Sequence, residues 1–240
     1  MRDAASLTLI ASIVEAPDGD ELFRRVQKAA VSLGFERVLV GVQIQLPTME
    51  PIQHVMSGWP DEYQQLYAER NFVFRDPTVV HCQTHSTPIV WSPDIYSERS
   101  YEVMEEARRF GLNSGISVPV HESARVKSMI SLARDRRVDI DRRETELLLA
   151  GGNVLASCAH VATSKLVIPA LLAEERPKLT PRESEIMQYV ARGKGSEVIG
   201  DILGLSKPTI EFHVKNALRK LGVASRLQGV ARAVALGLIH

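Results

Sequence analysis

Apolar residues recur at helical spacing in some segments of the chain and alternate with polar residues in others. The helical period predicts helices over Leu7–Val14, Leu22–Leu33, Pro60–Arg70 and Glu98–Phe110. Alternation predicts strands over Arg37–Gln45, Gln53–Ser57, Ile116–Val120 and Val126–Ala133, the last two as an antiparallel pair. Helices and strands mixed in this way predict an α+β fold, with an α/β/α sandwich around an antiparallel sheet.

The last sixty or so residues show only the helical period. Thr180, Pro181 and Glu183 form the pattern of a capping box with proline in the first turn. Gly193 is suited to end that helix, and Ser196 is placed to cap the next one. A tight turn at residues 204–206, a third helix from Ser206 to Leu221 and a fourth from Ser225 to Leu236 complete a four-helix unit with a helix-turn-helix.

The third helix of this unit has two distinct faces. Ile210, Val214, Ala217 and Leu221 share one face, which we expect to be core. The opposite face carries Phe212, Lys215 and Arg219, with Asn216 beside them. Contact with a thymine methyl group would explain a phenylalanine that faces solvent. The two cations would then contact phosphates or guanine edges. For an isolated helix, a solvated charged face would be an equally good interpretation.

Charge and composition divide the chain in the same place. The 240 residues contain 29 Lys and Arg and 29 Asp and Glu, but the part from Lys178 onward has a net charge of +5 and the remainder −5. Pro169 and Pro177 bracket a short segment that reads as a linker. We therefore expect a first domain over residues 1–168, a linker over 169–178 with at most a helical turn, and a C-terminal domain over 179–240.

The remaining composition narrows the class of protein. Cys82 and Cys158 are too few for a disulfide framework and suit a reducing cytoplasm. No uninterrupted apolar run reaches the length of a membrane span, and Leu7–Val14 reads as a helix rather than a signal peptide. The segment His81–His85 holds three potential metal ligands, but no fourth ligand is apparent, and we expect no metal site there.

A long helix precedes the linker. Asp141 and Glu144 resemble a capping box at its start. Its stripe of residues at helical spacing packs either against the sheet of its own domain or against a partner subunit, and two adjacent glycines permit close approach in either case. The stripe comprises Leu147, Gly151, Val154, Cys158, Val161 and Lys165, and the glycine pair is Gly151 and Gly152.

Aromatic residues are concentrated between positions 59 and 101, where eight of the thirteen lie. Trp59, Tyr63 and Tyr67 share one helical face. Packing in a core is the simpler interpretation of such a stripe. However, each ring has a polar tip, and a buried Asp76 nearby would need hydrogen-bond donors, which a small molecule with an N–H and carbonyl groups would complement.

Both halves of the chain resemble one family. Leu179–Glu183, Ile202–Ser206, Thr209–His213 and Asn216–Leu221 are similar to the DNA-binding domain of LuxR-type regulators. The resemblance implies that the third helix enters the major groove. The candidate DNA-binding residues are Lys207, Thr209, Glu211, Phe212, Lys215, Asn216 and Arg219. Gly200 departs from the family's usual alanine, and the substitution is expected to cost about 1 kcal/mol of helix stability.

The N-terminal half resembles the acyl-homoserine lactone domain of the same family, in Gly58–Pro60, Asp76-Pro77, Ile89–Ser92 and Gly111–Pro119. The resemblance implies that Asp76 accepts the ligand's amide N–H, that Tyr67 and Trp91 line the pocket, and that Ser131 reaches the ligand. Trp59 and Tyr63 stand where the family usually has tyrosine and tryptophan, respectively. Both exchanged residues remain hydrogen-bond donors, but their reach and size differ, so an unusual acyl or aryl group is expected.

These observations predict a cytoplasmic, homodimeric transcriptional regulator that binds an inverted repeat in double-stranded DNA and needs no cofactor besides its signal. The expected signal is an N-acyl- or N-aryl-homoserine lactone. One alternative is a regulator that responds to a non-lactone signal or needs no ligand. A lactone-processing enzyme is another, although no nucleophile elbow or phosphate-binding loop is present.

Overall fold

The computed structural model describes the chain apart from residues 1, 48–49 and 137–141. It forms two compact units. The first comprises Met1–Ile44 and Gln53–Ile168, and the second comprises Gln45–Ile52 and Pro169–His240.

The first unit is built around a five-stranded sheet with the strand order β2-β1-β5-β4-β3. Its strands are β1 (Arg37–Ile44), β2 (Ile52–Ser57), β3 (Ile89–Val90), β4 (Ser114–His121) and β5 (Val126–Arg134). The long central strands β1, β5 and β4 are antiparallel neighbours, so Leu39 and Ser117 both lie opposite Ser131. This register aligns distant parts of the chain in one row across the sheet.

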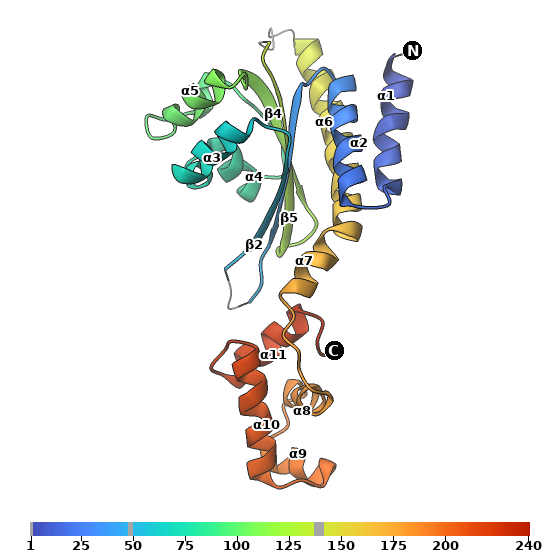
Figure 1. Ribbon diagram of the computed structural model, residues 1–240, viewed down its shortest axis with the longest axis vertical. Helices are drawn as coiled ribbons and strands as arrows, with labels where there is room; N and C mark the ends of the chain where they lie inside the picture. The colour runs from blue at the N-terminus through green and yellow to red at the C-terminus, as the bar shows by residue number, and fades with distance from the viewer. Residues whose placement is uncertain (1, 48–49, 137–141) are drawn as a thin grey trace. The chain divides into compact units, whose positions relative to one another are not determined.

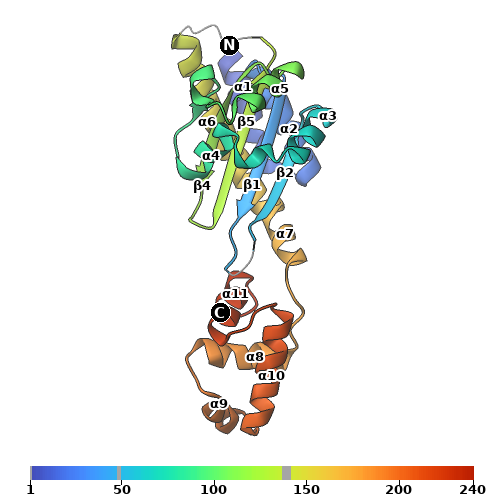
Figure 2. The same ribbon diagram turned by 90° about the vertical axis from the view of Figure 1, so that its left-hand side faces the viewer.

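Helices cover both faces of the sheet (Figure 1), which confirms the predicted α/β/α sandwich. One face is covered by α1 (Arg2–Ala11), α2 (Gly19–Ser32) and α6 (Arg142–Leu166). The other face is covered by α3 (Asp61–Glu69), α4 (Pro77–Thr84) and α5 (Tyr101–Arg109), which lie in front of the strands in Figure 2. Short 3₁₀ turns occur at η1 (Ser12–Glu15), η2 (Phe72–Phe74) and η3 (Pro93–Ile95).

The glycine pair of α6 brings this helix close to its own domain. A Cβ atom on Gly152 would lie 2.6 Å from Ile116 of β4, and one on Gly151 would lie 2.8 Å from Leu33. The sheet-facing side of α6 is therefore core, with Leu155 fully buried. Three members of the predicted stripe instead remain exposed: Leu147, Val154 and Val161, at 65%, 43% and 50%.

The structure adds elements that the hydrophobic pattern does not predict. Helix α4 and strand β3 have no counterpart among the expected elements, and α7 (Ile168–Glu174) is a longer helix than the single turn expected in the linker. Asp141 of the expected capping box lies outside the described residues.

The second unit contains α8 (Pro181–Ala191), α9 (Ser196–Leu203), α10 (Lys207–Lys220) and α11 (Arg226–Ala235). The Thr180–Glu183 capping box and the Ser206 cap are present as predicted. Ser196 does not cap α9, however. Gly195 occupies the N-cap, and the buried Ser196 hydroxyl accepts a 2.6 Å hydrogen bond from Arg226 instead.

The expected cost of Gly200 is also corrected. A Cβ atom at this position would lie 2.5 Å from the carbonyl oxygen of Leu205, in the turn between α9 and α10. Gly204 in that turn has a φ of +65°. Glycine at position 200 therefore permits the close approach of the turn, and this steric role opposes its poor helix propensity.

One described helical stretch, Arg143–Glu174, is long and apolar enough to cross a membrane by length and composition. Core helices of water-soluble proteins pass the same test, and this stretch supplies the buried residues Leu155, Ala159 and Ala162 to the first unit. This packing accounts for part of its apolar composition, since 44% of the apolar window is buried.

Candidate functional site

A cavity of about 350 Å³ lies in the first unit between the sheet and the helices α3 and α4. Its wall is predominantly apolar and takes residues from β1, β2, β5, α3, η2 and α4. Four candidate ligand-binding residues line it: Trp59, Tyr67, Asp76 and Ser131. The sheet and helices α3 and α4 that supply most of this wall are visible in Figure 2.

Asp76 is the buried carboxylate of the cavity, with 6% of its surface exposed. As the N-cap of α4, its Oδ1 accepts hydrogen bonds from the backbone N–H and the hydroxyl of Thr78, at 2.8 and 2.7 Å. Its Oδ2 accepts the Tyr67 hydroxyl at 3.0 Å, and the backbone N–H of Val79 also acts on the carboxylate. Burial raises the pKa of the Asp76 carboxyl, and these hydrogen bonds oppose the shift. A carboxylate oxygen has two lone pairs, so Oδ2 can accept a ligand N–H beside the Tyr67 hydroxyl.

Ser131 belongs to a chain of hydrogen bonds that begins at Trp91. The indole N–H of Trp91 donates to the Ser117 hydroxyl at 2.9 Å, and the hydroxyls of Ser117 and Ser131 lie 2.8 Å apart. In the bond between the two hydroxyls either oxygen can be the donor, because the Ser117 oxygen has a second lone pair besides the one that accepts from Trp91. Ser131 lines the cavity, and its hydroxyl can donate to a ligand when Ser117 donates to it.

Trp59 contains a second unused donor. Its indole N–H is buried and has no hydrogen-bond partner among the described residues. An unpartnered buried donor costs about 1–3 kcal/mol unless an acceptor is supplied. The cavity wall thus combines an unpartnered indole N–H on Trp59 with the hydroxyl of Ser131 and the carboxylate of Asp76.

The structure does not bring Tyr63 and Trp91 into the cavity lining. Tyr63 is 2% exposed and packs between Trp59 and Tyr67, with ring centroids 5.7 and 5.8 Å away. Trp91 packs edge-on against Trp59, at 6.2 Å, and lies over Gly115, where a Cβ atom would be only 3.0 Å from its ring. Both residues support the cavity wall from behind.

Several lining residues were not predicted from the sequence. The sequence does contain a signal for Thr78, because the hydroxyl of a Ser or Thr two residues after an Asp N-cap is placed to donate a hydrogen bond to the Asp carboxylate. Cys82 lies deeper on α4, and burial with the nearby Asp76 raises the pKa of its thiol to about 12. Val55, Met129, Gln43 and Lys127 also line the cavity, through a strand register that no local pattern specifies.

The ligands of the rejected metal site do not converge. His81 and His85 stack with ring centroids 4.5 Å apart, and His81 Nε2 lies 2.8 Å from the carbonyl oxygen of Thr87. Cys82 instead lines the cavity.

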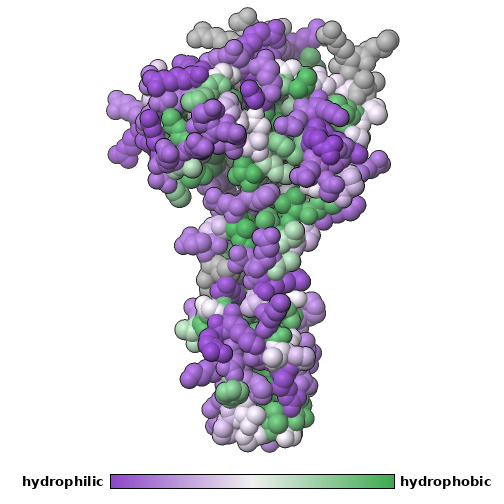
Figure 3. Space-filling model, in the orientation of Figure 1, coloured by the Kyte–Doolittle hydropathy of each residue, from purple (hydrophilic) through white to green (hydrophobic). Residues whose placement is uncertain are grey.

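Helix α10 of the second unit has the two faces predicted for it. Ile210, Val214 and Ala217 are buried against α8 and α9. Phe212 is 62% exposed, and Lys215 and Arg219 are also exposed. Figure 3 shows that hydrophilic side chains cover most of the second unit on the side it displays, with small hydrophobic patches among them.

The other candidate DNA-binding residues surround this exposed face. Lys207 is paired with Glu197 of α9 at 2.8 Å, and the Thr209 hydroxyl lies 2.8 Å from the Ser206 hydroxyl at the helix N-terminus. Glu211 is exposed and Asn216 is half-buried. An exposed face with cations and an aromatic ring on the second helix of a helix-turn-helix suits contact with a DNA groove.

Comparisons with known proteins agree with both halves. The autoinducer binding domain matches residues 18–162, and the domain of bacterial regulatory proteins of the luxR family matches residues 177–233. The transcriptional activator protein AnoR of Acinetobacter nosocomialis is 31% identical over 96% of this chain and 97% of its own. SolR of Ralstonia nicotianae is 34% identical over 93% and 94%, respectively.

Among solved structures, SdiA in complex with octanoyl-rac-glycerol has the same fold, with a TM-score of 0.73 at 22% identity over 99% of this chain and 96% of that one. The chain is therefore a DNA-binding transcriptional regulator with an autoinducer-binding domain. It belongs to the LuxR family, as a regulator of the quorum-sensing type. Because this is a family of regulators and not of enzymes, the lactone-processing alternative is excluded.

Proposed function

We propose that the cavity binds an N-acyl- or N-aryl-homoserine lactone and that the ligand controls DNA binding by a homodimer. The observation that carries the ligand class is the set of polar groups in an apolar cavity: the carboxylate of Asp76, the hydroxyl of Ser131 and the unpartnered indole N–H of Trp59. An N-acyl-homoserine lactone complements this set, because it has one amide N–H, two carbonyl groups and an apolar chain.

In the proposed complex, each polar group of the ligand has one partner. The amide N–H donates to Oδ2 of Asp76, beside the Tyr67 hydroxyl. One carbonyl accepts the Ser131 O–H, and the other accepts the indole N–H of Trp59 after a small rotation of that ring. Tyr63 shapes the site by fixing the positions of Trp59 and Tyr67, against which it packs.

Thermal unfolding of the full-length protein tests the ligand class. The panel contains acyl- and aryl-homoserine lactones, and also octanoyl glycerol, because SdiA was solved with octanoyl-rac-glycerol. We expect lactones to raise the Tm, since a ligand that binds only the folded state stabilises it. Asp76→Asn should remove about 1.5–3 kcal/mol of this stabilisation. A response to glycerides alone would favour a non-lactone signal, and no response would favour regulation without ligand.

We propose that the exposed stripe on α6 is the dimer surface. Leu147, Val154 and Val161 are seven residues apart along one helix, and all are more than 40% exposed. Exposed apolar side chains repeated every seven residues on a surface helix are typical of a helix–helix interface. A cytoplasmic location follows from the proposed action on DNA.

Sedimentation tests this surface. Val154→Glu should shift the ligand-bound protein from dimer towards monomer, because it introduces a charge into the stripe. Val80→Glu is a matched control, since Val80 has a similar exposure of 45% but lies on α4, across the sheet from α6. If both variants sediment as the wild type does, the dimer surface lies elsewhere.

A further inference from the structure

The cavity has two polar ends, separated along the strands. One end has the polar side chains of Ser57 on β2, Ser131 on β5 and Asp76, with the apolar Leu39 of β1 between the two serines. The other end is formed by Gln53, Gln43 and Lys127, each four residues away on the same strands. Gln43 and Lys127 are direct cross-strand partners. At about 3.3 Å per residue, the two ends are about 13 Å apart.

The wall between these ends is apolar. Val55 of β2 and Met129 of β5 line it on the sheet side, and Val79 and Cys82 line it on the α4 side. Gly41, opposite Met129, adds no side chain there. A ligand held by its head group at Asp76 therefore extends its chain along an apolar channel towards Gln43 and Lys127.

Lys127 is a cation without an acidic partner in the described part of the chain. Its ammonium group donates to the carbonyl oxygen of Gln83, near the C-terminus of α4. An ammonium group has three N–H donors, so two remain. Gln43 and Gln83 beside it are half-buried, and Gln53 is exposed, so this end of the cavity is a hydrated rim.

We propose that the chain of the signal ends in a hydrogen-bond acceptor, most effectively a carboxylate, which binds Lys127 at this rim. This proposal rests on the proposed lactone function and adds the chemical class of the tail. A methyl end group would lie among polar, hydrated side chains and gain nothing there. An anionic end group keeps its hydration at the rim and gains the attraction of the unpaired ammonium.

Three ligands with one chain length test the proposal: N-decanoyl-homoserine lactone, its ω-hydroxy derivative and its ω-carboxy derivative. We expect the ω-carboxy ligand to bind the wild-type protein about two- to fivefold more tightly than the unsubstituted ligand, the scale of a solvent-accessible charge pair. Lys127→Met should abolish or reverse this ratio, and Lys127→Arg should retain it. Arg125→Met is the matched control, because it removes a cation from the same β4–β5 hairpin outside the cavity lining.

Each outcome decides between the proposals. If all three lactones bind and the unsubstituted chain binds as tightly as the ω-carboxy chain, the tail assignment is wrong while the lactone function stands. The tail assignment is also wrong if Lys127→Met lowers the Tm but leaves the ligand ratio unchanged, because Lys127 then serves only to cap α4. If none of the three lactones stabilises the protein, the tail assignment fails, and the lactone function fails with it only if the panel of acyl- and aryl-homoserine lactones also gives no response.

Discussion

At the scale of single residues, the cavity depends on which polar atoms are already satisfied. Thr78 and Tyr67 satisfy much of Asp76, so this carboxylate is not the unpaired charge that its position in the sequence suggests. The Trp59 indole N–H is an unpartnered donor, and the Ser131 hydroxyl is a donor to the cavity when Ser117 donates to it. Residues behind the cavity wall therefore determine which hydrogen-bond donors and acceptors the wall presents to a ligand.

The hydrogen-bond chain from Trp91 leads to a prediction for Ser117. Ser117→Ala removes the acceptor of Trp91 and frees the Ser131 hydroxyl to turn away from the cavity. We expect ligand affinity to fall about threefold or more, and the free protein to lose about 1–3 kcal/mol because the Trp91 N–H is left unsatisfied. Titration calorimetry and denaturant unfolding measure the two effects.

Two further variants separate positioning from stability. Ser117→Thr keeps a hydroxyl and should restore ligand affinity. Ser100→Ala removes another buried serine hydroxyl, which bonds within residues 97–100 and not in the cavity. If Ser117→Ala and Ser100→Ala have equal ligand affinities, Ser117 does not orient Ser131.

The buried Asp76 predicts a pH dependence of ligand binding. Burial raises the pKa of this carboxyl in the free protein above the ordinary value of 3.8, which favours the neutral form and stabilises the free fold at low pH. A ligand N–H that donates to Oδ2 favours the ionised form instead. The ligand-induced rise in Tm should therefore shrink as the pH falls from neutrality through the raised pKa. Asp76→Asn should abolish this trend, and a trend that persists in the variant would assign it to another group.

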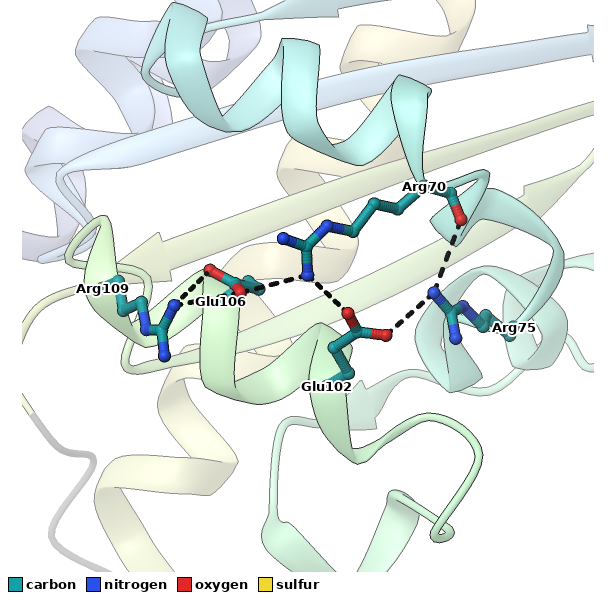
Figure 4. A network of polar contacts seen from close by, with 5 residues as sticks. All are labelled: Arg70, Arg75, Glu102, Glu106 and Arg109. Atoms are coloured by element: carbon teal, nitrogen blue, oxygen red, sulfur yellow. Dashed lines mark hydrogen bonds and ion pairs between the residues drawn. The ribbon is translucent and has the colours of Figure 1, made fainter.

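At the scale of elements, a network of ion pairs joins the end of α3 to α5 (Figure 4). Arg70 contacts both Glu102 and Glu106, with 3.2 Å to the latter, Arg75 pairs with Glu102 at 2.9 Å, and Arg109 pairs with Glu106 at 3.1 Å. The carboxylate of Glu106 is almost fully buried, whereas its partners are partly exposed. The network holds in place the helix that carries Tyr67 into the cavity wall.

Because Glu106 has two cationic partners, its removal should have a larger effect than that of an ordinary surface pair. We expect Glu106→Gln to lower the free energy of unfolding by about 1–3 kcal/mol and to loosen α3, so that ligand affinity also falls. Glu185→Gln is a control, because it removes a partly exposed pair with Arg182 in the second unit. Hydrogen exchange along α3 measures the loosening, and exchange rates equal to those of the control would limit the network to a surface role.

The sequence predicts the long elements because their periodicity is local, as in α2, β1 and β5. Helix α4 escapes prediction because it is short and lacks a clear apolar face, and its position depends on the Asp76 cap. The placement of Trp91 behind the wall requires Gly115 on a strand distant in sequence. The polar rim arises from the register of β1 and β5, whose Gln43 and Lys127 are far apart along the chain. Such long-range alignments leave no local pattern.

At the scale of the whole molecule, the regulator combines a ligand-binding domain with a basic helix-turn-helix domain, and two copies are proposed to bind DNA together. A homodimer with two-fold symmetry presents two copies of α10, so its site should be an inverted repeat with half-sites about one helical turn apart, or a multiple of it. Footprinting of the ligand-bound protein measures this spacing.

The aromatic and the cationic side chains on the exposed face of α10 are expected to affect DNA binding in different ways. Phe212→Ala should relax discrimination at a thymine, by about 1–3 kcal/mol if the ring contacts the methyl group. Lys215→Ala should weaken binding to all sequences and reduce the slope of log affinity against log salt by about one if Lys215 contacts a phosphate. Lys194→Ala is the matched control, because Lys194 is an exposed cation of the same unit outside α10. Salt titrations on matched and mismatched duplexes distinguish these outcomes, and if both α10 variants bind as the control does, α10 is not the helix that enters the groove.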